Sequence, residues 1–164
     1  MNTLLLESLD NYYNESNLNT LTEILNSQSV SLRVIDWFVT NYSKKHNIEY
    51  NNNSNIVNVY ISYKSQLKSY SKKFFDPFCR RNRINYKQSL STTIGQLNFF
   101  KWALTNGILD YVTNNYKTIE SDMNNSIIKK NKVSTNYRKK RKELSKSSYK
   151  TLTKRNNRII LTFD

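Results

Sequence analysis

Apolar residues near the start of the chain recur at helical spacing. Leu5, Leu9 and Tyr12 share one face, because positions three and four apart lie on the same side of a helix. Residues 20–23 read Thr-Leu-Thr-Glu and match a capping box, which predicts the start of a second helix there. Residues 1–28 are therefore expected to form short acidic helices that pack on the core.

The clearest helical pattern runs from Ser31 to about Lys45. Leu32, Ile35 and Val39 line one face, and Lys45 lies at the end where the helix dipole favours positive charge. We expect a core helix here. Residues 46–55 contain five asparagines and are expected to form a loop.

The next segment fits two periods. Apolar residues alternate as in a strand through residues 57–63, whereas those at 63–74 follow helical spacing. We favour a helix from about Tyr60 to Lys73, with residues 56–59 as an extended or helical lead-in. It should end before Asp76-Pro77, because the residue before a proline is disfavoured in helical conformation.

Two further helices are predicted. Residues 93–96 form a second capping-box match before a core face that contains Leu97 and Phe100. Gly107 is expected to stop that helix, since glycine readily adopts the left-handed conformation found after helix ends. The periodic residues of 108–123 predict one more helix.

The pattern as a whole predicts a mainly α fold. We expect a compact helical domain of about five or six helices over residues 1–125, in which 1–28 pack on a 30–123 core. Residues 126–164 should be a basic tail, in which 129–158 are disordered alone or helical when bound. Its last residues, 159–164, are apolar and strand-like; they either dock on the domain, bind a partner or fray.

Charge is segregated along the chain. Residues 126–158 hold 13 of the 26 lysines and arginines and one acidic residue, Glu143, so this segment carries +12 of the net charge of +14. Abundant Asn and Lys with scarce Gly and Pro indicate AT-rich coding, which inflates the number of lysines but does not explain their placement. Such a segment favours a polyanionic partner, nucleic acid first.

The tail contains the first set of candidate nucleic-acid-binding residues. Clustered cations neutralise phosphates and release counterions, which gives affinity without sequence preference. A purely solubilising tail or a targeting signal is the alternative, and residues 138–142 also fit a nuclear import signal. The candidates are Lys129, Lys130, Lys132, Arg138, Lys139, Lys140, Arg141, Lys142, Lys146, Lys150, Lys154, Arg155 and Arg158.

A second basic set lies within the predicted domain. Its members are Lys64, Lys68, Lys72, Lys73, Arg80, Arg81 and Arg83. The first three are four residues apart and would form a stripe on a helix. Aromatic residues are interleaved with them: Tyr63, Tyr70, Phe74, Phe75 and Phe78. Cations with stacking rings suit single strands or distorted duplexes, whereas the alternative is a solvated lysine face beside core aromatics.

Nothing in the sequence indicates catalysis. Cys79 lies beside two arginines, yet the chain has one cysteine and one histidine, His46, which is too few for a Cys/His metal site. Asp76 is expected to cap the Asp-Pro turn and to pair with a nearby arginine. We expect no enzyme activity, cofactor or metal. A single cysteine and no long apolar run favour a reducing, intracellular protein outside membranes.

Three segments carry a family resemblance. Residues 62–68, 75–84 and 92–104 resemble a family of small uncharacterised basic proteins of nucleocytoplasmic large DNA viruses, the giant viruses of protists. The resemblance covers roughly residues 30–123 and suits an AT-rich genome. It implies a viral setting and no known activity.

Our functional expectation is a non-enzymatic nucleic-acid-binding protein. DNA is favoured over RNA, binding is largely sequence-independent, and the role is viral genome condensation, packaging or gene expression. The alternative is a scaffolding protein of a virion core or viral factory that binds other core proteins. Both hypotheses place it in the viral factory or host cytoplasm, the host nucleus, or the virion core.

Overall fold

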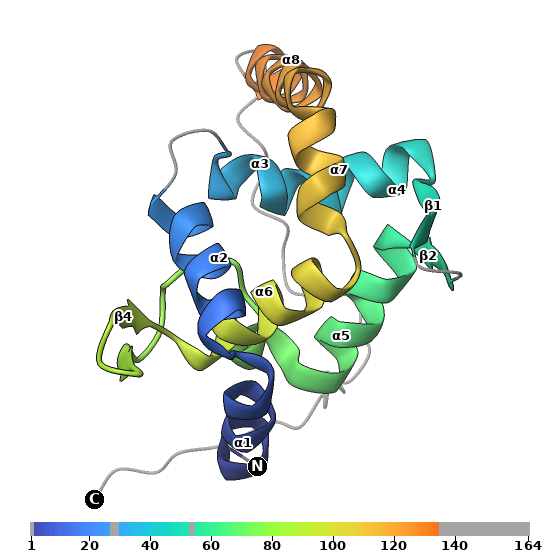
Figure 1. The fold of residues 1–164 in the computed structure, drawn as a ribbon. Coiled ribbons are helices and arrows are strands. Elements are labelled where there is room, and N and C mark those ends of the chain that lie inside the picture. The colour runs from blue at the N-terminus through green and yellow to red at the C-terminus, as the bar shows by residue number, and fades with distance from the viewer. Residues whose placement is uncertain (1, 27–29, 53–54, 135–164) are drawn as a thin grey trace, which may run out of the picture. The chain divides into compact units, whose positions relative to one another are not determined.

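The computed structural model describes residues 2–26, 30–52 and 55–134, with side chains described up to Ile128. Most of these residues lie in helices, which confirms the mainly α fold, and two short hairpins interrupt the helices (Figure 1). The chain divides into two units, residues 1–128 and 129–164. The packed core belongs to the first unit.

Two short helices open the chain, as predicted: α1 (Asn2–Tyr12) and α2 (Glu15–Asn26). The predicted capping box at residues 20–23 is wrong, because these residues lie inside α2. The side chain of Asn14 instead accepts a hydrogen bond from the backbone N–H of Asn17 at 2.9 Å, which satisfies the first turn of α2.

The predicted helix over 31–45 is present as three consecutive segments, α3 (Leu32–Trp37), η1 (Phe38–Tyr42) and α4 (Ser43–His46). Ser31 caps its start by accepting a hydrogen bond from the backbone N–H of Arg33. The middle segment is one π-helical turn, in which the N–H of Ser43 bonds to the carbonyl of Phe38.

A β-hairpin replaces the loop that we predicted for residues 46–55. Strand β1 (Glu49–Asn52) pairs antiparallel with β2 (Asn55–Asn58), and Tyr50 lies opposite Val57. The Tyr50 hydroxyl donates to the carbonyl of Asn106 at 2.8 Å, and Val57 is buried. The hydrogen bond with Asn106, a distant part of the chain, stabilises strands that the local Asn-rich sequence does not favour.

The predicted helix over 60–73 is α5 (Val59–Phe74), which ends before Asp76-Pro77 as expected. Asn58 caps it by accepting a hydrogen bond from the N–H of Ile61 at 3.0 Å. Ser71 interrupts it with φ 56° and ψ 169°, a left-handed backbone conformation that is rare for residues other than glycine. The final turn of α5 is therefore rotated relative to the rest.

A second hairpin, β3 (Ile84–Tyr86) with β4 (Leu90–Thr92), leads into α6 (Ile94–Thr105). Thr93 caps α6 as predicted, since its hydroxyl accepts from the N–H of Gln96 at 3.1 Å. The Gln96 side chain donates to the carbonyl of Pro77 at 2.9 Å, so it does not complete the reciprocal half of a capping box.

The helix predicted over 108–123 is two helices, α7 (Ile108–Asn114) and α8 (Tyr116–Ser134). Gly107 adopts φ 67° after α6, as predicted. Helix α8 continues to Ser134, so it includes the first six residues of the segment 129–158, which we expect to be disordered alone or helical when bound. Residues 135–164, including the apolar end at 159–164, lie outside the described residues.

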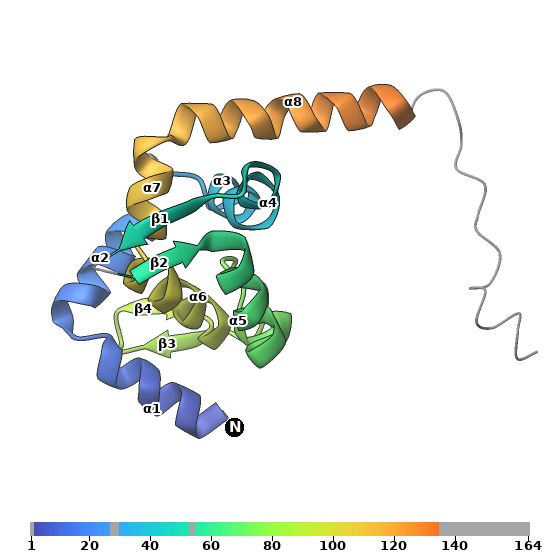
Figure 2. The same ribbon diagram turned by 90° about the vertical axis from the view of Figure 1, so that its right-hand side faces the viewer.

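The core centres on α6, whose predicted core residues Leu97 and Phe100 are fully buried, as is Ala103. Helices α1, α5 and α7 pack against it, and Figure 2 shows α5 beside α6. The core is rich in aromatic rings, such as Phe75 and Phe99, whose centroids are 5.2 Å apart. None of the described helices is both long and apolar enough to span a bilayer.

Asp122 attaches the start of α8 to the preceding helices. Its carboxylate accepts hydrogen bonds from Lys45 and from the Trp37 ring, the latter at 3.1 Å. Burial alone would raise the pKa of Asp122, but these two donors outweigh burial and lower it. The charged carboxylate therefore stabilises the attachment at neutral pH.

Candidate nucleic-acid interface

The folded part of the candidate interface, which we call the basic surface, occupies α5 and the loop before β3. Four of its residues lie on α5 and three lie on the loop. All seven side chains are exposed, as a phosphate-binding role requires. They are Lys64, Lys68, Lys72, Lys73, Arg80, Arg81 and Arg83.

The predicted lysine stripe is broken. Lys64 and Lys68 are one turn apart on the regular part of α5, but Ser71 lies between them and Lys72 with its non-helical backbone. Lys72 and Lys73 therefore follow a different face from the one that a continuous helix would give. The basic surface is a bent band of cations rather than a straight row.

Arg80 differs from the other six cations because it is paired. Its guanidinium donates to both carboxylate oxygens of Asp76, at 3.1 and 3.0 Å, and lies 4.5 Å from the ring centroid of Phe78. The hydrogen bond with Asp76 raises the pKa of Arg80 and keeps it charged. The predicted role of Asp76 is confirmed, since its Oδ1 also accepts from the backbone N–H of Phe78 at 3.2 Å.

A second carboxylate lies near this pair. Burial, followed by the neighbouring Asp76, raises the pKa of Asp36, while Arg80 and Lys72 act in the opposite direction. These two acidic groups reduce the positive charge that Arg80 presents to a ligand. Among the described residues, the other six cations of the basic surface have no carboxylate within ion-pair distance.

The structure divides the interleaved aromatic residues into two groups. Tyr63 and Phe75 are 6% and 1% exposed and belong to the core, so the suggestion that they stack on bases is wrong. Their ring centroids are 5.9 Å apart, and both rings contact Trp102. Tyr70, Phe74 and Phe78 are half-buried and keep part of each ring at the surface.

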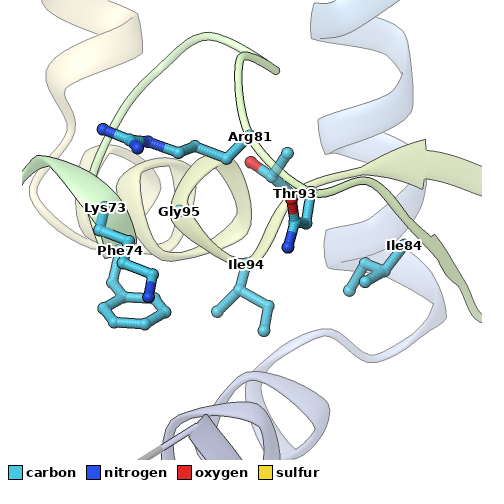
Figure 3. A pocket seen from close by; sticks show the side chains of 8 residues that line it. Lys73, Phe74, Arg81, Ile84, Thr93, Ile94 and Gly95 are labelled. Carbon is cyan, nitrogen blue, oxygen red and sulfur yellow. The ribbon is translucent and has the colours of Figure 1, made fainter.

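A pocket of about 250 Å³ adjoins the basic surface where the end of α5 meets the start of α6 (Figure 3). Lys73 and Arg81 supply its positive charge, while Phe74, Ile84 and Ile94 supply its apolar surface. In Figure 3 the Arg81 side chain extends alongside the first turn of α6 towards the Lys73 and Phe74 end. The two isoleucines were not predicted as site residues, because a single isoleucine carries no local sequence signal for a binding surface.

Close packing of backbone holds the two helices that form this pocket. A Cβ added at Gly95 would lie 3.1 Å from the carbonyl oxygen of Lys73, which is tighter than an ordinary contact, so a larger residue would require the two backbones to shift apart slightly. The N–H of Asp76 donates to the Gly95 carbonyl at 3.2 Å, and the Asn98 side chain donates to the carbonyl of Phe74 at 2.9 Å. These contacts fix the positions of Lys73 and Phe74 at the pocket.

The residues considered for catalysis lie in separate elements. Cys79 is half-buried in the loop after α5, and His46 is exposed at the end of α4 with its ring 4.4 Å from that of Tyr42. Within the described ranges, no three His, Cys, Asp or Glu side chains are grouped closely enough to hold a metal ion.

The tail candidates are described only in part. Lys129, Lys130 and Lys132 belong to the last turns of α8, whose backbone alone is described there. The other tail candidates, Arg138, Lys139, Lys140, Arg141, Lys142, Lys146, Lys150, Lys154, Arg155 and Arg158, lie outside the described residues.

Comparisons with known proteins confirm the viral resemblance. The sequence pattern of a family of unknown function, DUF7197, matches residues 4–137. An uncharacterised protein of Acanthamoeba polyphaga mimivirus is 46% identical over 127 aligned residues, which make up 69% of this chain and 49% of the relative. The chain thus spans about half the length of the curated relative that it matches. No solved structure matches the chain.

Proposed function

The chain belongs to the family of unknown function DUF7197, and we propose that it is a non-enzymatic nucleic-acid-binding protein that favours DNA. In the giant-virus setting of its relative, it would act in genome condensation, packaging or gene expression. Binding is largely independent of sequence, because the contacts are made between cations and phosphates. The proposal rests on the basic surface together with the basic tail.

The observation that carries this proposal is the concentration of unpaired positive charge in the folded unit. Residues 64–83 contain seven basic residues and one acidic residue, Asp76, whereas residues 1–50 contain three basic and six acidic residues. All seven cations are exposed, and only Arg80 is paired with a carboxylate in the described part of the chain. A solvated face with no ligand has no need to exclude carboxylates in this way.

The salt dependence of DNA binding tests the proposal directly. Each phosphate neutralised contributes about −0.9 to the slope of log K against log salt, so about ten contacts by the full chain would give a slope near −9. We expect K68Q/K72Q to reduce the magnitude of the slope by about 2. Arg33 and Lys117 are exposed cations outside the basic surface, so R33Q/K117Q is the matched control and should change the slope little.

Two results would overturn the proposal. One is an affinity for duplex and single-stranded DNA that does not depend on salt, and the other is no binding of either at low salt. If the two double variants gave equal slopes of log K against log salt, the basic surface would not be part of the interface and only the tail would bind DNA.

Scaffolding is the second candidate function, and one observation favours it. Ile56 on β2 and Ile61 in the first turn of α5 are 76% and 65% exposed, and these two elements contact each other. A protein partner would cover them. I56S/I61S should abolish capture of a viral core protein while leaving DNA affinity unchanged, whereas K68Q/K72Q should do the reverse.

A further inference from the structure

We propose that the pocket between α5 and α6 holds one unpaired base, so that the protein prefers single-stranded DNA to duplex DNA. This inference rests on the proposed function and specifies which form of nucleic acid the basic surface accepts. It follows from what lines the pocket, how large the pocket is, and what a duplex offers to it.

The lining combines charged and apolar surface, and a phosphate alone would not need the apolar part. Phe74, Ile84 and Ile94 are half-buried and leave apolar surface open to the pocket. A phosphate gains nothing from such surface, whereas the face of a base stacks on an aromatic ring and packs on aliphatic groups. The apolar part therefore indicates a base.

Positive charge lies beside the apolar surface, with the Lys73 ammonium over the Phe74 ring. Lys73 Nζ is 5.2 Å from the centroid of the Phe74 ring, and exposed Arg81 lines the same pocket. None of the described residues that line the pocket is acidic. A strand with one base against Phe74 would thus bring its neighbouring phosphates to cations, with no carboxylate to repel them.

The volume also matches a base better than a larger ligand. About 250 Å³ is below the range of roughly 300–1,000 Å³ typical of pockets for drug-sized molecules. A single planar ring fits such a space. In a duplex the bases are stacked and paired, so duplex DNA would reach Lys73 and Arg81 only through its phosphates and would leave the apolar surface unused.

Fluorescence anisotropy with the full chain tests the preference. The probes are a labelled oligothymidylate, a duplex of equal length, and thymidine monophosphate as a competitor. We expect F74L to weaken binding of the single strand about tenfold and to leave duplex binding unchanged, because leucine keeps the packing volume but not the stacking face. Y70L is the matched control, since Tyr70 is also half-buried on α5 and does not line the pocket.

Photocrosslinking of the unaltered protein gives a second readout that does not depend on a variant's folding. A single strand that contains 5-iodouracil should crosslink to the peptide containing Phe74. Crosslinks confined to other peptides, or equal effects of F74L on single strand and duplex, would overturn the inference. So would competition by thymidine monophosphate at the same concentration as the oligonucleotide, which would indicate a nucleotide pocket rather than a strand-binding site.

The two proposals fail in different ways. If neither form of DNA binds, the proposed function is wrong. If both forms bind with steep salt dependence and F74L does not distinguish them, the proposed function stands and only the preference for unpaired bases is wrong.

Discussion

The hydroxyl of Tyr13 donates a hydrogen bond to the backbone carbonyl of Leu97 at 2.7 Å, joining residues 84 positions apart in the chain. Tyr13 lies between α1 and α2 and is fully buried, and Leu97 is in the first turn of α6. This bond, together with the hydrogen bond from Lys101 to Ser8, attaches the acidic N-terminal helices to the central helix.

We expect Y13F to lower the free energy of unfolding by about 1 kcal/mol, the usual net value of a buried hydrogen bond. The ring and its packing remain, so the fold should be kept. Urea denaturation followed by circular dichroism measures the change. Y12F is the control, because the Tyr12 hydroxyl has no hydrogen bond among the described residues, and it should leave stability unchanged. Equal effects of the two variants would contradict this role of Tyr13.

Alkaline pH should destabilise the fold through its buried tyrosines. Burial, with a smaller effect of the nearby carboxylates of Asp36 and Asp76, raises the pKa of Tyr63 to about 12. The folded state therefore favours the protonated phenol. The contribution of the protonated Tyr63 phenol to stability is fully present below the unfolded pKa near 10. This contribution is lost as pH rises from about 10 towards 12.

Urea midpoints measured across that range test this prediction. The stability of the unaltered chain should fall above about pH 10, the pKa of an exposed tyrosine. Y63F should show a smaller fall, because phenylalanine has no group to ionise. If the stability of Y63F falls as steeply with pH as that of the unaltered chain, the alkaline loss comes from other tyrosines, such as Tyr50, whose pKa burial also raises to about 12.

Gln96 connects three segments near the basic surface, and its replacement by leucine should be costly. It is 3% exposed; its amide donates to the Pro77 carbonyl, and its side-chain oxygen accepts from the Thr92 hydroxyl at 2.8 Å. Q96L leaves both partners buried without a hydrogen bond, so we expect a loss of roughly 2 kcal/mol. Thermal denaturation measures it. Q66L, at a half-buried position without hydrogen bonds among the described residues, should cost far less.

Removing the carboxylate that pairs with Arg80 should strengthen DNA binding. Asparagine at position 76 keeps the oxygen that accepts from Phe78 but releases the charge of Arg80, so D76N should steepen the slope of log K against log salt by about 0.9. D110N adds the same net charge at an exposed position outside the basic surface and serves as the control. A decrease in affinity for D76N would show that the pair is needed to orient the loop.

Local signals in the sequence identified most helices correctly. Ser31 is the predicted start of one helix and Thr93 the predicted cap of another, and each side chain bonds to a backbone N–H two or three residues away. Gly107 is recognisable as a stop for a similar reason, since its left-handed conformation serves the end of the adjoining helix. Such interactions are contained within a few residues, so a single sequence is sufficient to predict them.

The hairpin at residues 49–58 and the break at Ser71 could not be predicted in the same way. Tyr50 stabilises the hairpin through Asn106, which is 56 positions away. The local sequence around Ser71 reads as a continuous helix, and only the backbone shows that the lysine stripe bends there. The hairpin depends on segments that approach one another only after folding.

The same distinction applies to the candidate interface. Net charge and its segregation follow from the order of residues alone, so the basic tail and the cations of the basic surface are recognisable without a structure. Whether a ring among those cations is buried depends on which elements pack over it: Trp102 covers Tyr63 and Phe75, while Phe74 remains at the surface beside the pocket. Charge is additive along a chain, whereas burial depends on contacts between residues that are distant in sequence and meet only in the folded protein.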